Sequence, residues 1–427
     1  MGCLVSTPSD SGGTRRRPAN VGEIVVFVPG LRIPKSSDFS PLQPEGLSSD
    51  LIQRLSALQT GIVLLADQEM QTASKSKKKT ATRHGGSTQA DLQQPLQPYL
   101  SMLLGLVNDG NRLEHLVEFV WVNQEDDTEK TGMSSAWYEV LSVLHFMAML
   151  SLSEANALLL PKTTTDGYQP KISEDSKRNS VDIFLKAAGY LDCAIQNVIP
   201  RLPPDVRKNL PVDLTEEVLN ALCLQALGQG AYIQLGMAID SAKATLAVKR
   251  RLACEMVKYW QQAQENIMNV SLASYWGDKH RLFIKWKYAE AKAAAYYFHG
   301  LILDETNTEK SHAMAVAALQ AAEEFLNESK KASEQFSMAP PQSSRNPPLW
   351  GATKYLYERI PKDASCRART NNELHSGHEN FTEKAPPLPD FPVALKPDDF
   401  SLPSPDASWN LKGNMRKEQI GETRSQF

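Results

Sequence analysis

The chain lacks the cysteine patterns of a disulfide framework or a zinc knuckle. Its 427 residues include five cysteines, an odd number, and no Cys-x-x-Cys pair. This usage is typical of a protein from a reducing compartment. The most apolar stretch without a formal charge runs from 140 to 153. It falls short of the roughly 20 residues that a membrane-spanning helix needs, so it predicts a buried helix.

Neither an excess of one charge nor a catalytic motif is present. The chain has 46 Lys and Arg against 49 Asp and Glu, which gives no basic field for a nucleic-acid partner. It contains no phosphate-binding loop, no His-Glu-x-x-His and no Gly-x-Ser-x-Gly, and Gly228-Gln229-Gly230 lacks the third glycine of a dinucleotide loop. We therefore expect no catalytic residues, no cofactor and no metal site. An active site assembled only in the fold is the alternative.

The first six residues, Met1-Gly2-Cys3-Leu4-Val5-Ser6, carry the most specific short motif. They match the pattern for myristoylation of Gly2, with a hydroxyl residue at the sixth position. A single myristoyl chain binds membranes only marginally, and Cys3 is placed for palmitoylation as a second anchor. We expect residues 1–21 to be a disordered, acylated arm at the cytoplasmic face of a membrane, the endosome and/or the plasma membrane. The alternative is an accidental Met-Gly start.

The region up to residue 200 favours helices with one strand. The β-branched run 23–28 precedes Pro29-Gly30 and predicts the strand. Residues 113–121 form a dense apolar element, and the Lys-, Thr- and Ser-rich insert 72–89 is interpreted as a basic, solvated loop. Apolar residues at spacings of three and four predict helices over 47–68, 134–160 and 181–198.

The second half of the chain predicts a solenoid followed by an extended segment. Four long helical patterns, joined by short turns, suggest two stacked antiparallel hairpins within 215–338. They cover 215–242, 245–270, 279–303 and 310–336. Of the 26 prolines, 12 lie between Pro340 and Pro405, so we expect 339–410 to be extended, either wrapping the solenoid or loose, with 411–427 as a flexible tail.

Several degenerate motifs, in this order, carry a family resemblance. They are helices ending in Phe119-Val120-Trp121, the segment 222–233, the Ala- and Tyr-rich segment 287–299, and the tail segments 357–361 and 385–389. The chain resembles the Bro domain family over residues 22–410, especially its single-domain BROX-like members and more distantly Alix. The resemblance implies a mainly all-α, banana-shaped helical solenoid with a tetratricopeptide-like core, a small β element near the N-terminus and extended tail segments.

The resemblance also implies a function. Bro domains are known as adaptors that bind the C-terminal amphipathic helix of an ESCRT-III subunit in endosomal sorting and membrane remodelling. The groove that receives this helix carries over onto Tyr232, Val248 and Leu252, with Ile233 beside the first. The chain has an acylation motif at Gly2 in place of a C-terminal prenylation box, and this arrangement resembles that of the plant BROX-like proteins.

Helical geometry gives the groove an independent reading. Ala253, Met256, Trp260, Ala263 and Ile267 share one arc and predict the core face of their helix. Val248 and Leu252 fall beside that arc, where they serve either as a docking strip or as ordinary packing against a neighbouring helix.

Basic residues on this helix and the next suggest a rim around the strip, or a face for anionic lipid. They are Lys249, Arg250, Arg251, Lys258, Lys279, Arg281, Lys285 and Lys287. A solvated charged face is the plainer interpretation. The predicted function is a membrane-anchored, non-enzymatic ESCRT-III adaptor. The alternative is a scaffold that binds anionic lipid through the basic face without a helix ligand.

Overall fold

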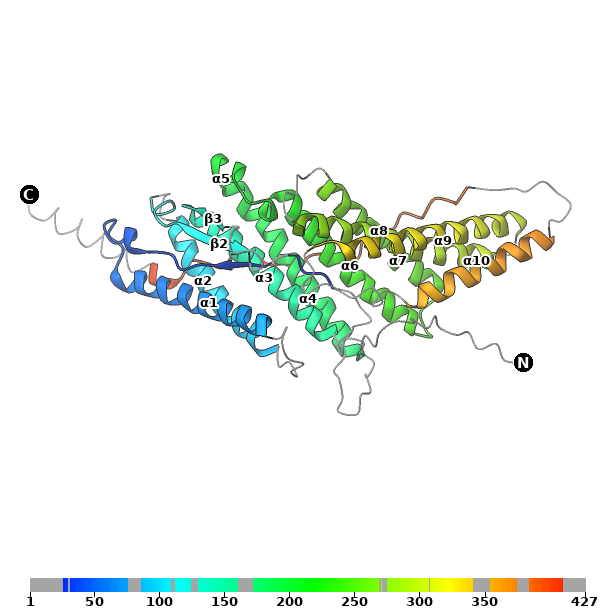
Figure 1. Ribbon diagram of the computed structural model, residues 1–427, viewed down its shortest axis with the longest axis horizontal. Coiled ribbons are helices and arrows are strands. Elements are labelled where there is room, and N and C mark those ends of the chain that lie inside the picture. The colour runs from blue at the N-terminus through cyan, green and yellow to red at the C-terminus, as the bar shows by residue number, and fades with distance from the viewer. Residues whose placement is uncertain are drawn as a thin grey trace, which may run out of the picture.

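The computed structural model is an elongated array of helices with a small sheet in its N-terminal half (Figure 1). The expected mainly all-α class with a small β element is therefore confirmed. The structure describes residues 26–29, 31–75, 86–108, 112–123, 130–159, 172–268, 270, 275–306, 308–340, 354–374 and 384–409. The acylation motif, with Gly2 and Cys3, lies outside these residues.

The sheet has three antiparallel strands in the order β1 (Arg32–Pro34), β2 (Phe119–Asn123) and β3 (Lys130–Met133). Ile33 pairs with Val122, and Trp121 pairs with Thr131. Two predictions are wrong here. Residues 26–28 are not a strand, because their side chains enter the helical core, where Phe27 packs on Phe283 and Phe336. The apolar element that ends at Trp121 finishes as a strand and not as a helix.

Three helices cover the sheet half of the molecule: α1 (Ser49–Lys75), α2 (Gly86–Asn108) and α3 (Ala136–Leu159). The predicted insert 72–89 is shorter than expected because α1 and α2 both extend into it, and the rest of it, 76–85, lies outside the described residues. Helix α3 is long and apolar enough to span a membrane, but most of its apolar window is buried inside the protein. It is a core helix, as the sequence predicted.

Helix α4 (Glu174–Cys193) connects the two halves of the molecule. The side chain of Ser173 caps it by accepting a hydrogen bond from the N–H of Ser176. A π-helical turn, Ala194–Val198, continues α4. A short 3-10 turn, Ile199–Arg201, which contains Pro200, follows it. The short helix α5 (Pro204–Lys208) then leads into the second half.

The second half contains the four predicted solenoid helices, which agree with the structure to within a few residues. They are α6 (Glu216–Asp240), α7 (Leu246–Met268), α8 (Tyr275–Glu305) and α9 (Glu309–Met338). Each packs on its neighbour in sequence. Close packing is possible because small residues face large ones: a Cβ on Gly228 of α6 would lie 2.8 Å from the indole of Trp260 on α7. The residues predicted for the core face of α7 are all buried.

The prediction that the whole segment after Ala339 is extended is wrong for helix α10 (Lys354–Leu374). Its buried residues Leu356, Ile360 and Ala364 recur every four positions and face α8 and α9. The hydroxyl of Tyr297 on α8 donates to Asp363 at 2.7 Å. Pro361 is tolerated inside this helix, and its presence concealed the helical pattern among the surrounding prolines.

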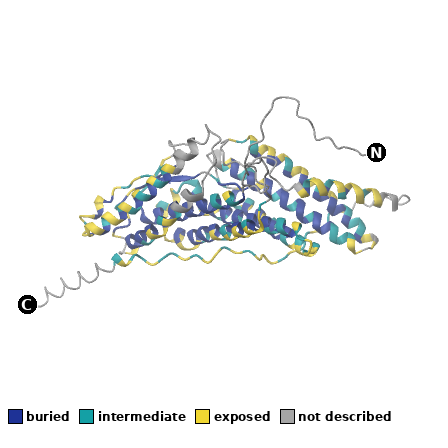
Figure 2. Ribbon diagram, turned by 90° about the horizontal axis from the view of Figure 1, so that it is seen from below, coloured by how far each residue is buried: buried dark blue, intermediate teal, exposed yellow. Residues whose placement is uncertain are grey.

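Residues 384–409, which we call the strap, are extended as predicted, apart from a final 3-10 turn (Ala407–Trp409). Figure 2 shows the strap as a thin chain along the lower edge of the helices. Its contacts run from α7, through α4, to α2 and α1. The strap therefore wraps the helical array.

Candidate docking face on helix α7

Helix α7 presents a short apolar strip beside its core face. Val248, in the first turn, is 46% exposed, and Leu252, one turn later, is partly buried against the core. Both lie off the arc of Ala253, Met256 and Trp260, which α6 and α8 cover. The strip is therefore available at the surface near the start of α7.

Tyr232 and Ile233 on α6 do not reach this surface. Tyr232 is 5% exposed and Ile233 is 1% exposed. The ammonium of Lys287 on α8 lies 4.0 Å from the centroid of the Tyr232 ring. The interface between α6 and its neighbours buries both side chains, and their place in the groove stays a prediction.

The strap covers the continuation of the strip along α7. Glu255 and Tyr259 follow Val248 and Leu252 at helical spacing, and both are buried. One oxygen of Glu255 accepts hydrogen bonds from the backbone N–H groups of Ala394 and Leu395 at 2.7 and 2.8 Å. The Tyr259 hydroxyl lies 2.8 Å from the same carboxylate oxygen and 2.7 Å from the Leu395 carbonyl. Sequence reasoning missed this role, because no local pattern marks Glu255 as the partner of a segment about 140 residues later in the chain.

Burial and the adjacent carboxylate of Glu255 raise the pKa of Tyr259 well above its usual range. The hydroxyl therefore keeps its proton and can donate it.

Two of the eight predicted basic residues do not belong to a basic face. Lys279 and Lys287 are fully buried. Lys287 pairs with Glu290 one turn away on α8, and this pair lies inside the fold. Lys279 donates to the carbonyl of Ala339 at 2.8 Å, and burial lowers its pKa to about 8. The prediction that these lysines meet lipid or an acidic partner is wrong, because a buried ammonium needs partners within the protein.

Three more basic side chains have partners within the described chain. Lys258 contacts Asp390 and the carbonyl of Phe391 on the strap. Arg281 pairs with Asp278 at 3.4 Å and donates to the Val270 carbonyl at 2.9 Å. Arg250 lies 3.3 Å from His299 and 5.6 Å from the centroid of the Phe391 ring.

The remaining three basic residues lie at the surface. Arg251 and Lys285 are exposed, and Lys249 is half-buried. Only Lys249 and Arg251 lie near the apolar strip, because Lys285 is one turn from Leu282, towards the opposite end of the hairpin. The basic rim is therefore smaller than predicted.

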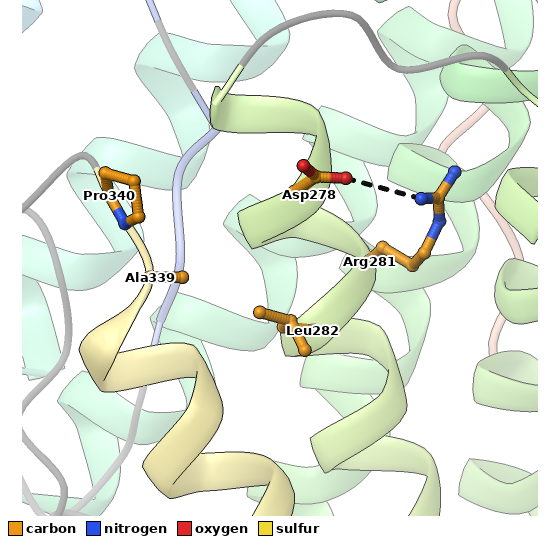
Figure 3. Close-up of a pocket in the computed structure, with 5 residues that line it drawn as sticks. All are labelled: Asp278, Arg281, Leu282, Ala339 and Pro340. Carbon is orange, nitrogen blue, oxygen red and sulfur yellow. Dashed lines mark hydrogen bonds and ion pairs between the residues drawn. The ribbon is translucent and has the colours of Figure 1, made fainter.

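A cavity of about 370 Å³ opens at the start of α8 (Figure 3). Asp278, Arg281 and Leu282 line it from α8, and Ala339 and Pro340 line it from the end of α9. Its charged groups are the paired Asp278 and Arg281. Because α7 and α8 are antiparallel, this cavity lies at the opposite end of the hairpin from Val248.

The most strongly shifted carboxyl group is structural. Glu139 of α3 is buried and accepts hydrogen bonds from Tyr99 at 2.9 Å and from the indole of Trp121 at 2.7 Å. Burial raises its pKa to about 7 against the opposing effect of these bonds. It connects α2, α3 and the sheet within the core. Within the described residues, no three His, Cys, Asp or Glu side chains lie together as metal ligands would.

Solved structures with the same fold include Bro domains. One described as "ALIX BRO1 CHMP4C complex" has a TM-score of 0.56 and 16% identity, and the match covers 90% of this chain and 100% of that chain. Another, described as "Structure basis for endosomal targeting by the Bro1 domain", has a TM-score of 0.53 and 17% identity, and covers 92% and 96%. At these identities the likeness shows the fold.

A third structure is ALIX in complex with the SIVmac239 PYKEVTEDL late domain. Its TM-score is 0.59 at 15% identity, and the match covers 90% of this chain and 50% of that one. No match was found among curated proteins. Placement beside the BROX-like or plant members stays a prediction. A family model described as "BRO1-like domain" matches residues 66–374, most of the helical array, and the chain therefore belongs to that family.

Proposed function

We propose that the protein is a non-enzymatic adaptor that binds the C-terminal amphipathic helix of an ESCRT-III subunit on the start of α7. The observation that carries this proposal is Val248, a large aliphatic side chain that is 46% exposed beside Leu252. An exposed apolar strip on a helix fits the apolar face of a partner helix. The Alix Bro domain, which has the same fold, was solved in a complex with CHMP4C.

The charges around the strip favour an acidic partner. Arg251 is exposed and Lys249 is half-buried, and both lie beside Val248 and Leu252 on α7. Such charges at the rim of an apolar contact contribute mostly to the association rate and to partner selection. A partner helix with apolar residues on one side and acidic residues beside them matches this arrangement.

The test is calorimetric titration of the full chain with C-terminal peptides from each ESCRT-III subunit. One peptide should bind, and Leu252→Asp should weaken its binding at least tenfold, since a charge would be placed in the apolar contact. Gln262→Asp, at an exposed position on the same helix, is the matched control and should bind normally. Far-UV circular dichroism should give the same helicity for all three proteins. Unchanged affinity in Leu252→Asp would reject the docking face.

We further propose that acylation at Gly2, with palmitoylation at Cys3, holds the adaptor at the cytosolic leaflet of endosomes or the plasma membrane. Confinement to one surface raises the effective concentration of adaptor and partner, so a weak helix contact suffices. A Gly2→Ala, Cys3→Ala double variant should lose vesicle flotation after expression in cells with acyltransferases. Strong residual flotation that falls with salt would instead favour the lipid-binding scaffold.

The burial of two predicted face residues bears on that alternative. Lys279 and Lys287 are inside the fold, and Lys258 pairs with the strap. Each exposed Lys or Arg near an anionic leaflet contributes about 1 kcal/mol, so the smaller rim gives the scaffold less binding energy than the sequence suggested. The adaptor is therefore the function we favour.

A further inference from the structure

The strap is held at its two ends by different chemistry. Near its start, Glu255, which is 1% exposed, binds two strap N–H groups. At its finish, Asp406 pairs with Arg54 of α1 through two contacts of 3.1 and 2.9 Å, and its N–H donates to the Ser101 carbonyl at 3.1 Å. The Arg54 side chain is 51% exposed, so solvent screens this ion pair. The finish is therefore the more weakly protected end.

Three glycines inside helices make room for the strap: Gly230 of α6, Gly189 of α4 and Gly105 of α2. An added Cβ would lie 3.2 Å from Leu395 at the first, 2.5 Å from the Asp398 carbonyl oxygen at the second and 2.0 Å from the Trp409 indole at the third. Glycine in a helix interior costs about 1 kcal/mol relative to alanine. The closest of these three contacts is that of Gly105 with Trp409, the last described residue of the strap.

Ser408 joins the ion pair to the indole. Its backbone N–H and its hydroxyl both donate to one oxygen of Asp406, at 2.9 and 2.6 Å. Both hydrogen bonds lower the pKa of Asp406, and the bond from the hydroxyl has the larger effect. They also close the turn 407–409, which places the Trp409 indole over Gly105. Loss of the Ser408 hydroxyl bond would therefore loosen both contacts of the strap's finish.

We propose that residues 406–409 form a latch that opens independently of the start of the strap, and that phosphorylation of Ser408 opens it. The reaction transfers a phosphoryl group from a nucleoside triphosphate to Oγ, releasing the hydroxyl proton, with the nucleoside diphosphate as leaving group. The ester carries about −1.5 to −2 charges at neutral pH and has no hydroxyl to donate to Asp406. Arg54 supplies a single positive charge against the ester and the carboxylate together.

The latch also has a mechanical consequence. It fastens the strap to α1 and α2, whereas the start of the strap is fastened to α7 in the other half of the molecule. The strap thus spans both halves, beside helix α4 that connects them (Figures 1 and 2). When the latch opens, the strap is released from α1 and α2 but stays bound to α7.

Hydrogen–deuterium exchange of the full chain tests the proposal. Ser408→Glu supplies a negative charge and should speed exchange in peptides covering 400–409 at least tenfold, with 390–398 unchanged. The matched control is Ser404→Glu, which adds the same charge at an exposed strap position and should leave both segments as in the wild type. Wild-type exchange in Ser408→Glu, or equal loss of protection in both segments, would overturn the proposal.

A second variant approaches the latch from the other side. Gly105→Ala should raise the helix propensity of α2, yet its Cβ would occupy the space of the Trp409 ring. We expect the same fast exchange in 400–409, with α2 itself still protected. Retained protection of 400–409 would reject the latch. Opening by Gly105→Ala but not by Ser408→Glu would reject Ser408 as the switch.

Discussion

Helix α7 presents one outward row of residues to two different surroundings. In the first turns the row consists of two aliphatic residues, Val248, which is 46% exposed, and Leu252, which is half-buried. In the middle turns it consists of Glu255 and Tyr259, which bind the backbone of the strap. An extended chain brings unpaired N–H and C=O groups, so it requires polar partners, whereas a folded helix brings an apolar face. Residue type along this row therefore matches the kind of chain that packs on each part of it.

The largest expected effect comes from removing the acceptor of the covered part. Glu255→Ala leaves the N–H groups of Ala394 and Leu395 without their acceptor, whereas the Tyr259 hydroxyl keeps the Leu395 carbonyl. We expect a loss of about 3 kcal/mol in the free energy of unfolding, because hydrogen bonds to a charged group are being lost in a buried site. Urea denaturation measures it. Glu265→Ala, exposed on the same helix, should change stability by less than about 0.5 kcal/mol. An equal loss of unfolding free energy in the two variants would contradict this prediction.

A smaller effect is expected at the second polar residue. Tyr259→Phe keeps the ring and removes only the hydroxyl that contacts Leu395 and Glu255. The free energy of unfolding should fall by about 1 kcal/mol. In hydrogen exchange, the loss of protection should appear at 390–398 and not at 400–409. A stability equal to the wild type would show that the carboxylate alone holds the strap.

The smallest effect on stability is expected in the uncovered part. Val248→Ala removes two methyl groups from a side chain that is 46% exposed, so unfolding should change by less than about 0.5 kcal/mol. Affinity for the ESCRT-III peptide should nevertheless fall roughly fivefold, about 1 kcal/mol, if the side chain becomes buried on binding. A stability loss above about 1 kcal/mol would show that Val248 is a core residue and not a docking residue.

The helices of the solenoid were predictable because their apolar periodicity is local. Four long patterns placed α6 to α9, and the core face of α7 followed from spacing alone. The segment 23–28 was misassigned because β-branched residues favour strands, whereas the position of Phe27 is decided by contacts with α8 and α9 far along the chain. Helix α10 was missed because a single Pro361 inside a helix cannot be distinguished by sequence from prolines in extended chain.

The candidate site was predictable only in part. Val248 and Leu252 could be placed beside the core face from helical angles, and the structure leaves both near the surface. The burial of Tyr232, Lys279 and Lys287 depends on how α6, α8 and α9 pack, which no local pattern encodes. The role of Glu255 depends on a strap about 140 residues later in the chain.

The packing of Phe27 between helices α8 and α9 has a consequence for biosynthesis. Its ring contacts Phe336, about 300 residues further along the chain. At roughly 5–20 residues added per second, about 15–60 seconds pass between the synthesis of these two side chains. Phe283 of α8 is made earlier, but the packing of Phe27 is complete only once Phe336 of α9 has been synthesised. We expect chaperone capture of residues 26–28 on the ribosome until α8 and α9 have been made.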